Sequence, residues 1–261
     1  MLSDEEFAKA AKKYSLGAYL RRRPVTAMSI SLSELETQCR AFEKVEPRDS
    51  IYRVSTFLVR EWWGDPAKLV DALSVLLLIW NGAFYRYGSF SEEALETCLR
   101  ANEKVLNGFR AREISSFDAA DETNTEKLFL SLSQALRRTV DNVESPVSAG
   151  KALHLLAPIF FPLWDQYIAP GYGCPYSGEL ASVAYIAFSR KIQTIAAQLG
   201  VELANDGGTR KQWLSNKSLL KRIDEYNYMT FTIPAMKGKA RARTALRSPA
   251  GVLGLNDLPD N

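Results

Sequence analysis

The chain carries at residues 145–169 the stretch SPVSAGKALHLLAPIFFPLWDQYIA, the most distinctive segment of its 261 residues. Pro146 and Ser148 are residue types that commonly begin helices, so an apolar helix is expected to start here. Lys151 follows in the first turn of this predicted helix. Few other catalytic motifs occur in the chain, so this segment is the leading candidate for a functional site.

The second half of the same stretch predicts another helix start. Pro158 and Pro162 cannot continue a regular helix, so the first helix is expected to end there. Trp164 and Asp165 then open the next helix. The ammonium group of Lys151 and the carboxylate of Asp165 are therefore predicted to meet at adjoining helix ends.

Apolar residues at helical spacing recur along nearly the whole chain and predict an all-α fold. Helices are expected near 4–14, 31–44, 50–63, 66–84, 91–108 and 211–226, and the apolar patterns of 128–140 and 183–199 add two more, the latter ending at Gly200. Loops are expected at 112–122, 170–178 and 204–210, and alternation typical of strands is confined to Met229–Ile233. The loop at 170–178 either forms one wall of a pocket or is a plain interhelix turn.

The stretch at 145–169 resembles the central motif of helix-hairpin-helix DNA glycosylases. In that family a glycine-rich hairpin and a lysine precede an apolar helix, and a Phe-Pro-x-x-Asp sequence then carries the catalytic aspartate. Phe161-Pro162-Leu163-Trp164-Asp165 matches this second half. The resemblance implies a compact multi-helix, glycosylase-like fold in which Asp165 and Lys151 are the catalytic residues.

The hairpin half of the motif departs from the family pattern. Glycines in the hairpin let the backbone approach a DNA phosphate closely. This chain has Val147 and Ala149 at two such positions and keeps only Gly150. The sequence therefore predicts a degenerate hairpin.

The resemblance also implies a mechanism. Breaking the bond between a base and deoxyribose builds positive charge at the sugar, which a nearby carboxylate stabilises. Asp165 would supply this carboxylate. Lys151 would either form a Schiff base with C1′, leading to strand cleavage by an AP lyase reaction, or steer a phosphate. In the absence of such chemistry, Asp165 would be a helix cap and Lys151 a surface lysine.

A second segment, residues 66–87, is similar to an early helix of the same superfamily. In that superfamily the end of this helix enters the DNA duplex where a base has been flipped out. By this interpretation Asn81 fills the hole or contacts the orphan base, while Tyr85, Arg86 and Tyr87 provide stacking faces and a phosphate contact. The alternative is that Asn81 and the glycine after it cap a buried helix without contacting DNA.

His154 is the only histidine of the chain and lies nearly on the helical face of Lys151. It either lines the substrate site together with Trp164 or is buried and bonded to a carbonyl group. One histidine excludes the zinc sites that need two or more, and three scattered cysteines predict neither a disulfide framework nor an iron–sulfur cluster. No metal or other cofactor is expected, and no nucleotide-binding glycine motif is present.

Positive charge gathers in the C-terminal part of the chain. The whole sequence has 33 Lys and Arg against 30 Asp and Glu, but residues 209–247 hold ten basic and two acidic residues, leaving 23 basic against 28 acidic elsewhere. Such a stripe suits a phosphate backbone. Its uncompensated members, expected to contact DNA, are Lys237, Lys239, Arg241 and Arg243.

Length and composition place the chain among ordinary globular proteins. We expect a helical glycosylase-like domain at 1–235, with two helical lobes and a cleft between them, followed by a basic, partly flexible tail at 236–261. The apolar run at 69–80 is too short to cross a bilayer, and the N-terminus does not resemble a secretory leader, so a cytoplasmic monomer without a membrane partner is expected.

These features together predict a DNA glycosylase that flips a modified base out of double-stranded DNA and excises it, leaving an abasic site. The pattern also resembles phage-defence glycosylases, which implies antiviral action on hypermodified cytosine such as glucosylated hydroxymethylcytosine. The main alternative is a non-catalytic helical DNA-binding or regulatory protein, and an RNA-directed N-glycosidase is a third possibility.

Overall fold

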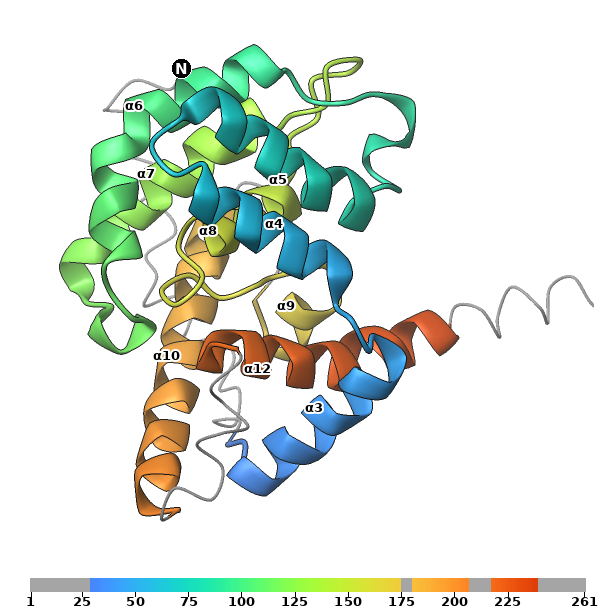
Figure 1. The fold of residues 1–261 in the computed structure, drawn as a ribbon, viewed down its shortest axis with the longest axis vertical. Coiled ribbons are helices and arrows are strands. Elements are labelled where there is room, and N and C mark those ends of the chain that lie inside the picture. The colour runs from blue at the N-terminus through green and yellow to red at the C-terminus, as the bar shows by residue number, and fades with distance from the viewer. Residues whose placement is uncertain (1–28, 175–179, 207–216, 239–261) are drawn as a thin grey trace, which may run out of the picture.

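The computed structural model describes residues 29–174, 180–206 and 217–238, and these residues contain helices and no strand (Figure 1). The all-α prediction is confirmed. The helices are α3 (Leu32–Val45), α4 (Ser50–Glu61), α5 (Pro66–Trp80), α6 (Glu92–Arg110), α7 (Ala119–Ala135), α8 (Pro146–Leu156), α9 (Ile168–Gly171), α10 (Ala181–Asn205) and α12 (Leu219–Asn227), with the 3₁₀ turns η1 (Tyr85–Tyr87) and η2 (Ile114–Ser116) and the π-helix η3 (Tyr228–Thr232). The helix predicted at 4–14 lies outside the described residues.

Capping side chains explain where several helices begin. The Ser91 and Asp65 side chains accept hydrogen bonds from the first turns of α6 and α5. Asp118 caps α7 in a capping box with Asp121, so this helix begins inside the stretch predicted as a loop at 112–122. A strong cap therefore overrides the polar composition of that stretch.

Three further predicted boundaries are wrong. α10 continues through Gly200 to Asn205, because one glycine costs a long helix only about 1 kcal/mol. α5 ends at Trp80 rather than near residue 84, because the chain turns at Asn81 and Gly82 into η1. The apolar pattern at 128–140 places the end of α7 too late, because the helix ends at Ala135 and Val140 is exposed.

The helices form two groups that α10 joins (Figure 1). We call α4 to α8 the upper lobe and α3, α12 and η3 the lower lobe. α10 contacts α7, α8 and η2 in the direction of the upper lobe, and α12 and α3 in the lower lobe. α8 packs against α4, α5 and α7, so the helix that carries Lys151 lies inside the upper lobe.

The segment that resembles the glycosylase hairpin is helical. Val147 and Ala149 both lie within α8, for which Ser145 is the N-cap. Lys151 consequently lies in the second turn of α8, and the prediction that it lies in the first turn is wrong. Gly150 faces the core, where a Cβ added to it would contact Trp164 and Tyr185 at 3.4 Å. The glycine that survives from the motif therefore faces the protein core, where a Cβ would make ordinary van der Waals contacts.

The continuation of α10 through Gly200 can be tested by stability. A Cβ at Gly200 would meet no atom within 4 Å, so Gly200→Ala is expected to raise the free energy of unfolding by about 1 kcal/mol in urea denaturation. Gly171→Ala provides the contrast, because its Cβ would lie 2.5 Å from the Phe231 ring, and we expect it to destabilise. A loss of stability in Gly200→Ala would contradict the helix assignment.

Candidate functional site

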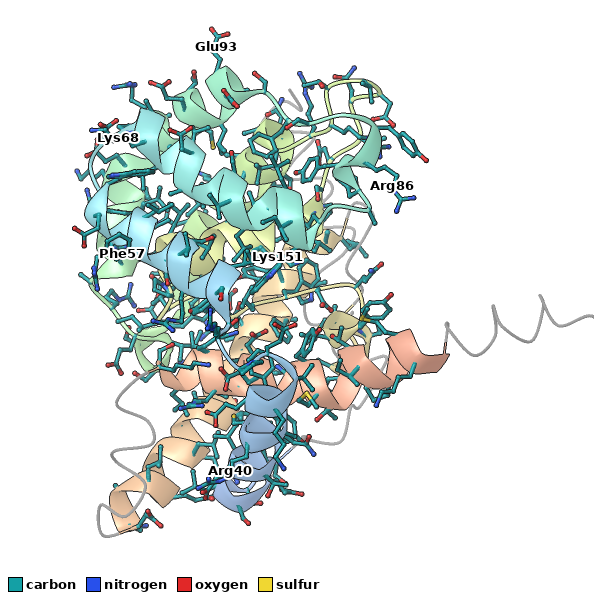
Figure 2. All side chains as sticks on the ribbon, turned by 45° about the vertical axis from the view of Figure 1, so that its right-hand side comes forward. Arg40, Phe57, Lys68, Arg86, Glu93 and Lys151 are labelled. Atoms are coloured by element: carbon teal, nitrogen blue, oxygen red, sulfur yellow. The ribbon has the colours of Figure 1, made fainter. Side chains whose placement is uncertain are left out.

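Lys151 is buried near the middle of the molecule, with only 7% of its surface exposed (Figure 2). Its Nζ donates a hydrogen bond of 2.6 Å to Asn81 Oδ1, at the end of α5, and lies 3.5 Å from the carbonyl oxygen of Trp80. The same ammonium group lies 5.7 Å from the centre of the Trp80 ring. The alternative of an ordinary surface lysine is therefore excluded.

Burial changes the acidity of this lysine. Removal from water lowers the pKa of Lys151 from 10.5 to about 8, and the negative charges of Asp165 and Asp224 act in the opposite direction. Both carboxylates are thus within electrostatic reach of the ammonium group. At neutral pH the site holds a lysine that loses its proton far more readily than an exposed one.

Asp165 is half-buried and lies between α8 and α9. Its Oδ1 accepts hydrogen bonds of 2.7 and 2.8 Å from the backbone N–H groups of Tyr167 and Ile168, and its Oδ2 lies 3.5 Å from the hydroxyl of Thr232 in η3. Oδ1 therefore caps the turn that leads into α9, but the N-cap residue of that helix is Tyr167, so the prediction that Trp164 and Asp165 open the helix is wrong. The carboxylate also places its charge within reach of Lys151.

Asn81 and Tyr85 point into the protein. Asn81 is 8% exposed, and its Nδ2 donates a hydrogen bond of 2.6 Å to Ser148 Oγ. The Tyr85 hydroxyl lies 2.8 Å from the Leu136 carbonyl and 2.9 Å from Ser148 Oγ. Asn81 is also the C-cap of α5, as the structural alternative predicts. The structure thus brings Asn81, Tyr85 and Lys151 into one buried network.

The other predicted residues of this segment are exposed. Tyr87 is 76% exposed, and Arg86 projects outward at the rim of the upper lobe (Figure 2). Both side chains are accessible to a partner. Neither joins the buried network around Lys151.

His154 and Trp164 are completely buried. His154 Nδ1 lies 2.7 Å from the Phe161 carbonyl and Nε2 lies 2.9 Å from the Tyr52 hydroxyl. A carbonyl oxygen can only accept, so Nδ1 carries the proton and Nε2 accepts from Tyr52. Burial lowers the pKa of His154 to about 3, which keeps the ring neutral. The expectation of a buried histidine bonded to a carbonyl is confirmed, and Trp164 packs in the core against Phe129 and Tyr185.

A second buried lysine, Lys221, which the sequence does not single out, also lies near the Trp80 ring. Lys221 is 1% exposed, and its Nζ lies 3.0 Å from Asp224 and 3.3 Å from Asp49. Burial acts to lower the pKa of Lys221, but the charges of Asp224 and Asp49 outweigh it and raise the pKa above its ordinary value. The only sequence signal is the spacing of Lys221 and Asp224 on one helical face.

Aromatic rings join the two lysines. Tyr52 stacks on Trp80, with 6.3 Å between ring centres and 9° between their planes. Lys221 Nζ lies 4.4 Å from the centre of the Tyr52 ring and 5.8 Å from that of Trp80. Trp80 thus has a buried ammonium group from each lysine near its ring.

A cleft of about 660 Å³ opens beside this cluster, where the starts of α4 and α12 meet. Tyr52 and Lys221 belong to its wall, so the cleft reaches the ring that stacks on Trp80, the tryptophan near Lys151. The other lining residues are Glu43, Glu46, Pro47, Arg48, Asp49, Arg53, Thr56, Pro158, Lys217, Ser218 and Arg222. Residues 170–174, from the loop predicted to wall a pocket, are not among them.

The predicted basic stripe is only partly an exposed surface. Lys221 and Arg222 are buried in ion pairs, and Lys217 pairs with Glu225. Lys237 is exposed at the end of the helical segment that follows η3. Lys239, Arg241 and Arg243 lie outside the described residues.

Neither a metal site nor a membrane span is found in the part of the chain that the structure describes. Within 29–174, 180–206 and 217–238, no group of three or more His, Cys, Asp or Glu side chains could hold a metal ion. No helix in the same ranges combines the length and the apolar character needed to cross a bilayer. Comparison with known proteins finds no matching family model, no matching curated protein and no matching solved structure.

The lowered pKa of Lys151 predicts a pH dependence of stability. Between pH 8 and 10.5 the unfolded chain still binds the proton that folded Lys151 has released, so the free energy of unfolding gains on the order of 3 kcal/mol from this residue as pH rises through that window. Lys151→Met removes this contribution. The free energy of unfolding of the wild type minus that of Lys151→Met, measured by denaturant unfolding, is therefore expected to increase as the pH rises from 8 to 10.5. Other titrating groups cancel in the difference.

Lys104→Met is the matched control, because Lys104 is exposed on α6. We expect the stability of this variant to follow that of the wild type across the same pH range. Parallel curves for the wild type and Lys151→Met would contradict the assignment of a lowered pKa to Lys151.

Proposed function

We propose that this protein is a DNA glycosylase that excises a modified base from double-stranded DNA, with Asp165 and Lys151 as its catalytic residues. One observation carries the proposal: a buried lysine with a lowered pKa lies within electrostatic reach of an aspartate, and both belong to the segment that resembles the glycosylase motif. A buried lysine with a lowered pKa beside a carboxylate is the kind of arrangement that clusters at functional sites.

The proposed role of Asp165 follows from its two oxygen atoms. The backbone N–H groups of Tyr167 and Ile168 fix Oδ1 and therefore the plane of the carboxylate. Among the described residues, Oδ2 has one hydrogen-bond contact, with the Thr232 hydroxyl at 3.5 Å, and the proposal assigns this oxygen to the substrate. A carboxylate fixed in this way stabilises the positive charge that develops at C1′ as the base leaves.

The proposed role of Lys151 follows from its acidity. With a pKa of about 8, about one Lys151 side chain in ten is neutral at pH 7, against about one in 3,000 for an ordinary lysine. The lone pair of the neutral amine attacks C1′, and the bond between C1′ and the base breaks. The base leaves with the bonding electrons and takes up one of the two amine protons. The bond between C1′ and O4′ then breaks, the second amine proton passes to O4′, and a C=N bond between C1′ and Nζ gives the Schiff base.

Accessible side chains supply the proposed contacts to DNA. Arg86 and Tyr87 are exposed beside the end of α5, and Lys237 is exposed in the lower part of the molecule. Within this proposal the substrate includes hypermodified cytosine of phage DNA, and the enzyme acts as a cytoplasmic monomer in antiviral defence. The competing function is DNA binding without catalysis, in which Asp165 serves only as a helix cap.

Asp165→Asn separates these two functions, because asparagine retains the cap and loses the charge. We expect the wild type to produce alkali-labile sites in duplexes that contain a series of natural and modified bases, including glucosylated hydroxymethylcytosine. Asp165→Asn is expected to reduce the rate by roughly 100-fold or more. Mass spectrometry of the released base identifies the substrate.

Asp118→Asn is the matched control, because Asp118 is an exposed cap at the start of α7 and plays no part in the proposed site. Its activity is expected to equal that of the wild type. Intact DNA with every substrate, or equal activity in Asp165→Asn and the wild type, would refute the proposed function.

Schiff-base formation gives a separate prediction for Lys151. Borohydride should trap a covalent complex between the protein and a duplex that contains an abasic site. The trapping rate should increase with pH and reach half of its maximum value near pH 8, the pKa of Lys151. Lys151→Met should form no complex, while Lys104→Met should match the wild type. Base release without trapping would assign Lys151 to phosphate steering instead.

A further inference from the structure

The network that holds Lys151 is made of uncharged side chains from the end of α5, from η1 and from the start of α8. Lys151 Nζ contacts Asn81 Oδ1 at 2.6 Å, and Asn81 Nδ2 contacts Ser148 Oγ at 2.6 Å. Ser148 Oγ in turn lies 2.9 Å from the Tyr85 hydroxyl and 2.6 Å from Ser145 Oγ. These five side chains are buried.

The ammonium group fixes the orientation of the Asn81 amide. Lysine has three N–H donors and no acceptor, so the amide atom that faces it must be the oxygen. The amide nitrogen must then face Ser148, which accepts its hydrogen bond. Ser148 is itself held by Ser145, the N-cap of α8, and by Tyr85.

The cap of α5 does not require the Asn81 side chain. The cap bonds are made by the backbone N–H of Asn81 to the carbonyl groups of Leu77 and Ile79. The side chain is therefore left to bind Lys151 and Ser148. Burying an amide and an ammonium group is costly unless they are hydrogen-bonded, and here they bond each other and Ser148.

We propose that Asn81 is a positioning residue for Lys151, and that Ser148 holds Asn81 in the orientation this requires. The idea that the amine so positioned is a nucleophile rests on the proposed glycosylase function. When Lys151 loses a proton, its two remaining N–H groups have acceptors in Asn81 Oδ1 and the Trp80 carbonyl. The lone pair then occupies the remaining tetrahedral position, directed away from both.

The positioning role is tested first without any DNA. The pH midpoint at which Lys151 titrates is measured by NMR on protein labelled with ¹³C at the lysine ε-carbon. The Lys151 signal is identified as the one that is missing in Lys151→Met. Asn81→Leu removes the acceptor and should lower this midpoint, and Asn81→Asp should raise it by placing a negative charge there. Ser148→Ala should shift it in the direction of Asn81→Leu, by less.

Ser133→Ala is the matched control, because Ser133 is buried on α7 and its hydroxyl has no hydrogen-bond partner among the described residues. We expect it to leave the Lys151 midpoint unchanged. Circular dichroism establishes whether each variant is folded. If Asn81→Leu does not fold, the conservative variants Asn81→Asp and Ser148→Ala still test the proposal. Unshifted midpoints in all folded Asn81 and Ser148 variants would overturn the proposal.

Borohydride trapping on abasic duplex DNA then separates positioning from a mere effect on acidity. Asn81→Leu increases the fraction of neutral amine, so an acidity effect alone would make trapping at pH 7 faster. Loss of positioning should instead make it slower, by roughly 10- to 100-fold. Faster trapping would overturn the positioning role. If the wild type forms no trapped complex while the midpoints shift as expected, the interaction of Asn81 with Lys151 is supported and the proposed lyase reaction is refuted.

Discussion

The burial of one ammonium group, that of Lys151, is the constraint around which the site is organised. An isolated charge cannot be buried without partners, because water solvates it far better than an apolar core. The protein supplies the Asn81 amide, the Trp80 carbonyl and ring, and the charge of Asp165. These partners offset only part of the penalty, so the lysine pKa remains lowered.

The contrast with Lys221 shows that burial alone does not determine acidity. Both ammonium groups lie near the Trp80 ring, at 5.7 Å for Lys151 and 5.8 Å for Lys221. Lys221 has direct ion pairs with Asp49 and Asp224, which favour its charged form. Lys151 makes its short hydrogen bond to a neutral amide instead. Lys221 is thus held in its charged form by ion pairs, whereas Lys151, which makes its short hydrogen bond to a neutral group, has a lowered pKa.

Asp165 combines a structural and an electrostatic contribution. Its Oδ1 caps the turn into α9, while the charge of the carboxylate favours the protonated form of Lys151. The two contributions are compatible, because capping holds the group in place without removing its charge. The proposed function therefore requires no conformational change that would free the carboxylate from its cap.

The sequence by itself determined the helical character of the chain and most helix starts, because apolar spacing and capping residues act over a few neighbouring positions. It also indicated Lys151, Asp165 and Asn81 as residues of interest. Only the tertiary structure decided that Asn81 turns inward to bind Lys151, that His154 bonds Tyr52, and that Lys221 is buried in ion pairs rather than exposed in a basic stripe. Those contacts join residues 70, 102 and 172 positions apart, Lys151 with Asn81, His154 with Tyr52 and Lys221 with Asp49. Local spacing carries no information about such pairs, because the packing of whole helices against one another brings them together.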